Sequence, residues 1–170
     1  MASEVTLQQE LHQTKPFRSA AEESVVGLLF TADLVRRALA GAVEREGLTL
    51  QQYNVLRILR GAGEHGLPTL QIGERMLEKT PGLTGLLDRL ERKGLVSRRR
   101  CTEDRRRVFC TISRRGGQVL ADLDDPVEAC IVHVTRKLSE RQVTRLVRLQ
   151  AAVRSGCRQE AMVSGADAGA

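Results

Sequence analysis

Aromatic side chains are scarce in this sequence, which has three Phe, one Tyr and no Trp among its 170 residues. Proteins that bind single-stranded DNA or unpaired RNA stack the exposed bases on aromatic rings. The scarcity of rings therefore argues against that class of partner. Double-stranded DNA remains the preferred polyanion, because it is recognised through groove contacts and phosphate charge.

Long apolar runs are also absent. The first 19 residues are polar and mixed in charge, unlike a secretory signal peptide. No stretch approaches the roughly 20 apolar residues that a membrane-spanning helix needs. We therefore expect a cytoplasmic protein with no membrane partner.

Closely spaced cysteines and familiar catalytic motifs are missing as well. The four Cys lie far apart, and the three His form no metal-ligand spacing with them. The HExxH, GxSxG, P-loop and GxGxxG patterns do not occur. The sequence thus predicts no catalytic residue, no metal and no cofactor, and a cytosolic enzyme of unknown class is kept only as a rival hypothesis.

Positive charge, in contrast, is concentrated in one segment. Residues 89–115 carry eleven Lys or Arg and three acidic residues, a net charge of +8, whereas the whole chain carries +6. Charge confined to one segment predicts a polyanion bound at a defined place. The alternative, a solvated charged face, usually mixes both signs.

An amphipathic helix is predicted over residues 80–93. Its apolar stripe consists of Leu83, Leu86, Leu87 and Leu90. Thr80 is expected to cap the helix, with Pro81 at the first helical position and Gly94 as the stop signal. The opposite face offers small or polar groups to another surface, namely Gly82, Thr84, Gly85, Asp88, Arg89 and Arg92.

A basic β-hairpin is predicted after this helix, over residues 95–100 and 107–113. Apolar and polar residues alternate along its second strand, as in a half-buried strand. Two helices are predicted before residue 80, one opened by a capping box at Thr49 and Gln52 and one capped by Thr69. Three helices followed by a basic hairpin form a winged helix-turn-helix.

Helices on both sides of this lobe carry more apolar surface than a small winged domain requires. Residues 19–46 are apolar on more than one face, and Pro126 is expected to kink or break the helix after the hairpin. The simplest use for the excess is a homodimer interface. We expect an N-terminal arm (1–18), a helical dimerisation region (19–47 and 114–155), a DNA-binding lobe (48–113) and a flexible tail (156–170).

These segments resemble the MarR family of bacterial transcription regulators. The resemblance rests on LTLQQYNVLRIL at 48–59, LQIGERM at 70–76, TPGLTGLLDRLERKGLV at 80–96 and CTEDRRRVFCTIS at 101–113. It implies a mainly α-helical fold, a winged helix-turn-helix flanked by N- and C-terminal dimerisation helices. It also implies a homodimer on a pseudo-palindromic operator, usually a repressor released by a small-molecule effector or by thiol oxidation.

The resemblance assigns roles to individual residues. Asp104 is expected to hold an Arg and fix the wing, and Arg106 to enter the minor groove with Arg105 and Arg107 in support. Thr80, Thr84 and Arg89 would face the major groove or its phosphates. Arg92, Arg98, Arg99 and Arg100 complete the predicted DNA-binding set. One departure is Gly85, where relatives often carry Arg, so a long base-reading side chain is missing.

The sequence therefore predicts a homodimeric, sequence-specific regulator that binds double-stranded DNA and responds to a small molecule. One alternative is a thiol-based redox sensor of the same fold, with Cys101 as the reactive residue because three Arg precede it. Another alternative is an architectural protein that binds DNA without sequence preference.

Overall fold

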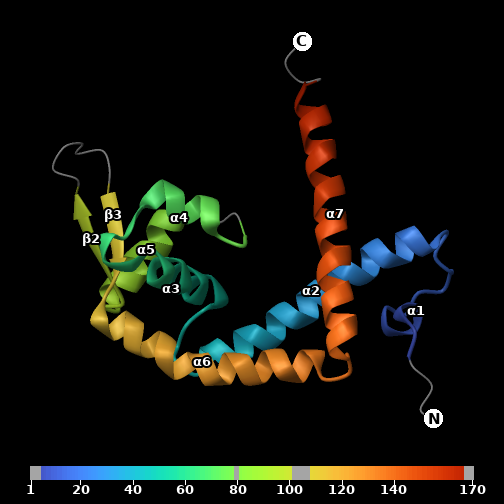
Figure 1. Cartoon of the computed structure of the whole chain (residues 1–170), viewed down its shortest axis with the longest axis horizontal. Helices are drawn as coiled ribbons and strands as arrows, with labels where there is room; N and C mark the ends of the chain where they lie inside the picture. Colours follow the sequence, from blue (N-terminus) through green and yellow to red (C-terminus); the bar gives the residue numbers. More distant parts are fainter. Residues whose placement is uncertain (1–4, 79–80, 101–107, 167–170) are drawn as a thin grey trace. The chain divides into compact units, whose positions relative to one another are not determined.

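The computed structural model describes residues 5–78, 81–100 and 108–166, with side chains through Arg158. The backbone forms two compact units, Met1–Cys130 and Ile131–Ala170. The chain is mainly helical with one small sheet, as the sequence predicted (Figure 1). The elements are α1 (Leu7–Glu10), α2 (Ala20–Glu44), α3 (Leu50–Ala62), the 3-10 turn η1 (Gly63–His65), β1 (Leu67–Pro68), α4 (Thr69–Arg75), α5 (Leu83–Arg92), β2 (Val96–Arg100), β3 (Val108–Ile112), α6 (Arg114–Thr135) and α7 (Glu140–Ala166). Within these residues no helix is both long and apolar enough to cross a membrane.

Side-chain caps explain where α2 and α3 begin. The Ser19 hydroxyl accepts a hydrogen bond from the Glu22 amide (3.1 Å) at the start of α2. The Thr49 hydroxyl accepts from the Gln52 amide (3.2 Å), and the Gln52 side chain accepts from the Thr49 amide (3.1 Å). This reciprocal pair is the capping box that the sequence predicted.

One hydrophobic core holds the first unit together. It gathers residues from α2, α3, α4, α5, the sheet and the first half of α6. The fully buried large side chains are Val43, Val55, Leu56, Leu59, Ile72, Leu86, Leu87, Leu90, Cys110, Leu120 and Leu123. Since the predicted leucine stripe of α5 supplies three of them, the opposite face of α5 is left free to meet another surface.

The sheet has three antiparallel strands in the order β1-β3-β2. The predicted hairpin is confirmed, with Val96 opposite Ile112 and Arg100 opposite Val108. The third strand, β1, was not predicted from the sequence, because two residues are too few to show a period. Thr69 was also misassigned, since it is the first residue of α4 and its hydroxyl donates to the main-chain oxygen of Val108 (3.4 Å).

The start of α5 differs from the prediction. Gly82, not Thr80, precedes the first helical residue, and its φ of +92° is one that glycine adopts without strain. Pro81 therefore lies before the helix, and Thr80 is outside the described residues. The end of α5 is as predicted, because Gly94 (φ +69°) allows the Leu95 amide to bond Leu90 O (3.0 Å).

The last two helices differ from the prediction. Ser113 caps α6 as predicted, accepting from the Gly116 amide (2.9 Å). A kink or a break was predicted at Pro126, but α6 continues through the proline as one helix, with Leu123 and Val127 buried in the core on either side of it. The helix α7 continues past residue 155 to Ala166.

Two glycines let main chains approach closely in the first unit. A Cβ on Gly66 would lie 2.2 Å from Cys110 O, and a Cβ on Gly116 would lie 2.2 Å from Leu95 O. Both distances are far below van der Waals contact, so only glycine fits at either position. Gly116 joins the start of α6 directly to the start of β2.

Candidate nucleic-acid interface

The exposed face of α5 is the first part of the candidate interface. Thr84, Arg89 and Arg92 are exposed on this helix, while Leu86 and Leu87 are 1% and 0% exposed. The buried leucines fix the helix in the core and so fix the direction of the polar face. Arg92 also lies in the last turn of α5, where a cation is favourable.

The surface around Gly85 is open. A Cβ built on Gly85 would meet only Nη1 of Arg89, at the ordinary contact distance of 3.8 Å. The Arg89 guanidinium thus lies over the space that a side chain at position 85 would otherwise fill.

Arg98 on β2 is bound to α5. Its Nε and Nη2 donate to Glu91 Oε2 (2.8 and 2.5 Å), and Nη2 also donates to Asp88 Oδ1 (2.5 Å). The hydrogen bond to Glu91 is the main cause that raises the pKa of Arg98, and Asp88 adds to it. Only 25% of the Arg98 side chain is exposed, compared with 46% of Asp88. A DNA contact of Arg98 stays a prediction. The Arg98 guanidinium links β2 of the wing to α5.

Strand alternation explains why Arg98 differs from its neighbours. Successive side chains of a strand point to opposite faces, so Arg98 shares a face with buried Val96. Arg99 lies on the other face, and both Arg99 and Arg100 are exposed. Two features of the sequence could therefore have indicated the Arg98 contact. Alternation along β2 turns Arg98 to the buried side, and α5 carries two acidic residues three positions apart.

Several predicted site residues lie outside the part of the chain that the structure describes. They are Thr80, Cys101, Asp104, Arg105, Arg106 and Arg107. Their roles remain predictions. The strands that carry the hairpin tip are described, and Arg100 and Val108 form the last pair before it.

The thiol of Cys110 is buried at the base of the wing. Its Sγ lies 3.8 Å from Thr69 Oγ1, and Arg98 is its cross-strand neighbour. Burial raises the pKa of Cys110, and the contact with Thr69 only partly offsets this. A buried thiol with a raised pKa is inert, so Cys110 belongs to the core.

An ion pair connects α3 with α6. The Arg60 guanidinium donates to both carboxylate oxygens of Asp124, over 2.9 and 3.0 Å. This hydrogen bonding lowers the pKa of Asp124 and raises that of Arg60. The ion pair ties α3 to α6, a link that was not predicted from the sequence.

Metal binding finds no support in the described part of the chain. Residues 5–78, 81–100 and 108–158 bring together no three His, Cys, Asp or Glu side chains able to hold an ion. The exposed side chains of the candidate interface, Thr84, Arg89, Arg92, Arg99 and Arg100, are hydrogen-bond donors, and four of them are positively charged. Such groups suit phosphate oxygens and the edges of bases.

Comparison with known proteins agrees with this geometry. The model of the MarR family matches residues 48–108. The transcriptional regulator MhqR of Bacillus subtilis is 32% identical over 101 residues, which cover 59% of this chain and 68% of MhqR. The homoprotocatechuate degradative operon repressor of Escherichia coli is 27% identical over 107 residues, 63% of this chain and 71% of the repressor.

A solved structure extends the match to most of the chain. The crystal structure of a MarR transcription factor from Planctomyces limnophilus is similar with a TM-score of 0.63 and 34% identity. The match covers 81% of this chain and 99% of that one. Members of the family are transcription regulators, not enzymes. The winged helix-turn-helix, its exposed basic face and these similarities together show that the chain belongs to the MarR family of DNA-binding transcription regulators.

Proposed function

We propose that the protein is a homodimeric repressor that binds a pseudo-palindromic operator in double-stranded DNA. The observation that carries this proposal is the orientation of α5, which buries Leu86, Leu87 and Leu90 in the core. Thr84, Arg89 and Arg92 are exposed on its other side. A helix fixed in this way presents its polar face to the major groove. The strands β2 and β3 extend beside it as the wing, and we assign the minor groove to Arg106 at their tip.

The proposal assigns three kinds of role to the side chains: contacts to bases, contacts to phosphates, and positioning of the wing. Thr84 and Arg89 reach base edges, and Arg92, Arg99 and Arg100 neutralise phosphates. Arg98 holds the wing against α5 through Asp88 and Glu91. Thr80, Asp104, Arg105 and Arg107 keep the roles that the sequence predicted.

Exposed apolar side chains support the homodimer. On α2 they are Val25, Leu28, Leu29 and Leu34, and on α6, α7 and the turn that joins them Ile131, Val132, Val134, Leu138, Leu146, Val147, Leu149 and Val153. Apolar surface on this scale usually marks a protein interface. Two copies would place their α5 helices in successive major grooves, about 34–36 Å apart. We propose 19–47 and 114–155 as the dimerisation region, 48–113 as the DNA-binding lobe, and 1–18 and 156–170 as an arm and a tail outside both.

Release by a small-molecule effector completes the proposal. It rests on family membership and on the similarity to a repressor of a degradative operon. An effector acts by binding one of two dimer states more tightly, and so it changes the population that is able to bind DNA.

The test is selection of bound fragments from the host genome with the full-length protein. Fluorescence anisotropy then compares a selected fragment with random DNA at the same salt concentration. Specific binding should be about 10³-fold tighter or more. Equal affinities for both DNAs would refute a sequence-specific regulator and support the architectural alternative. The same assay with candidate ligands identifies an effector by loss of the complex.

A further inference from the structure

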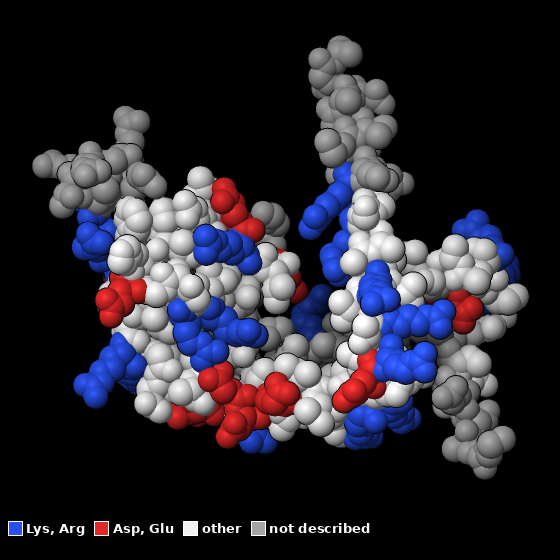
Figure 2. All heavy atoms as spheres, viewed as in Figure 1, with Lys and Arg blue, Asp and Glu red and all other residues white. Residues whose placement is uncertain are grey.

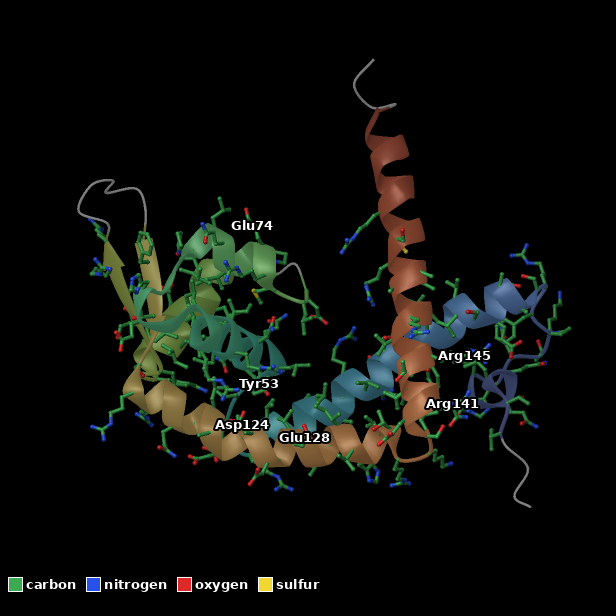
Figure 3. All side chains as sticks on the ribbon, viewed as in Figure 1. Tyr53, Glu74, Asp124, Glu128, Arg141 and Arg145 are labelled. Atoms are coloured by element: carbon green, nitrogen blue, oxygen red, sulfur yellow. The ribbon has the colours of Figure 1, made fainter. Side chains whose placement is uncertain are left out.

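The helix α7 carries a basic face near its start. Arg141, Arg145 and Arg148 recur at positions i, i+4 and i+7, so they lie along one side of the helix. All three side chains are exposed, and Arg141 and Arg145 are labelled in Figure 3. None of them belongs to an ion pair formed within the described residues. Among the side chains that the structure describes, this basic face has no acidic partner.

The helix α6 carries an acidic face of matching size. Asp122, Asp124, Asp125 and Glu128 fall within seven residues, and no Lys or Arg occurs between Arg115 and Arg136. The four acids are exposed, and acidic side chains gather over α6 in Figure 2. Asp124 is occupied by Arg60 and Asp122 accepts from Gln118 (2.9 Å), whereas Asp125 and Glu128 have no such partner among the described residues.

The two faces agree in length as well as in sign. At about 1.5 Å per residue, the acidic face from 122 to 128 spans about 9 Å. The basic face from 141 to 148 spans about 10.5 Å by the same measure. Exposed Leu149, four residues after Arg145, lies beside the basic face and supplies apolar area for a contact. Charge and length thus favour a helix with a short acidic stretch as the occupant. The helix α6 of this chain carries such a stretch.

We infer that the basic face of α7 in one copy docks on the acidic face of α6 in a second copy. The inference rests on the homodimer of the proposed function and specifies how the copies recognise each other. Two-fold symmetry makes the contact reciprocal, so each dimer contains it twice. Apolar area supplies the affinity, and the charges choose the partner and reject apposition of like faces.

The test uses two full-length variants that each reverse one face. Asp125→Lys with Glu128→Lys makes both faces basic, and Arg141→Glu with Arg145→Glu makes both faces acidic. Each variant alone should dimerise on the order of 10-fold more weakly than the wild type, because four favourable pairs become repulsive. Arg154→Glu with Arg158→Glu, a reversal of the same size on another face of α7, should leave dimerisation unchanged. Circular dichroism verifies that every variant keeps its helix content.

Mixing the two face-reversed variants is the decisive step. In a mixed dimer both contacts regain opposite charges, so heterodimers should exceed the statistical half in native mass spectrometry. A statistical mixture, or wild-type homodimerisation by both variants, overturns the docking of these faces. Weaker operator binding by the Arg141/Arg145 variant with intact dimerisation also overturns it and assigns the basic face to DNA. A wild-type chain that is monomeric at micromolar concentration would overturn the proposed homodimer itself.

Discussion

Replacement of Arg98 by Met separates a DNA contact from a positioning role. Methionine retains much of the length of the side chain but removes both ion pairs to α5. Exposed ion pairs contribute about 0.2–1 kcal/mol each. With three quarters of the Arg98 side chain covered, we place the loss for two pairs at about 1–2 kcal/mol. At a urea m-value near 2 kcal/mol/M, the unfolding midpoint should fall by about 0.5–1 M at fixed protein concentration.

A double-mutant cycle identifies the partners. In a background with Asp88→Asn and Glu91→Gln, the further change Arg98→Met should cost almost nothing, which gives a coupling free energy of about 1–2 kcal/mol. Arg99→Met is the matched control, because Arg99 is exposed on the opposite face of the same strand. Its effect on unfolding should stay within about 0.5 kcal/mol.

Operator binding gives the second readout. If Arg98 positions the wing, Arg98→Met weakens binding while the dependence of log K on log salt keeps its slope. A lost phosphate contact would instead reduce that slope by about 0.9. Additive free energies of unfolding in the cycle, together with a reduced slope, would refute the positioning role and restore Arg98 to the direct DNA contacts.

Three further predictions concern other parts of the chain. Arg106→Ala should weaken operator binding and reduce the salt slope by about 1, and wild-type values would show that the wing assignment is wrong. Gly116→Ala should destabilise the fold by about 3 kcal/mol or more in urea titrations, because its Cβ would lie 2.2 Å from a main-chain oxygen. Gly117→Ala, where a Cβ meets nothing within 4 Å, should be neutral or stabilising, and equal losses would contradict the close approach. The pKa of Asp124 is lowered by Arg60, so the pair stabilises the fold above the unfolded carboxyl pKa of about 3.9, and this contribution disappears as pH falls through the lower folded value. Asp124→Asn should therefore cost up to about 1 kcal/mol at pH 7 and nothing near pH 2, and a pH-independent difference would exclude the ion pair as its cause.

Most of the fold could be predicted from the spacing of apolar residues along the sequence. The leucine stripe of α5 reflects the buried side of a regular helix, and the residue pattern of β3 correctly predicted a strand paired with β2. The capping box at Thr49 and the stop at Gly94 were predicted correctly because a few local residues determine them. These features need no knowledge of which elements meet in space.

Contacts between elements that are far apart in the sequence could not be predicted from it. The two-residue β1 exists because it pairs with β3 about 40 residues later. The continuous α6 depends on core packing on both sides of Pro126, which overrides the local preference of proline. For the same reason, the ion pairs from Arg98 to α5 and from Arg60 to Asp124 were not predicted, although the sequence shows all of these charged residues.

The junction at the base of the wing also has a mechanical consequence. Ser113 donates to both Leu95 O (3.0 Å) and Gly94 O (2.7 Å), and Gly116 packs on Leu95 O, so the start of α6 is joined to the turn between α5 and β2. The five residues of β2 reach about 17 Å from that joint. A rotation of α6 by about 5° there would move the end of β2 by about 1.5 Å, half the length of a hydrogen bond. A ligand that tilts α6 by this small angle could therefore dislodge the wing from a groove without approaching the DNA.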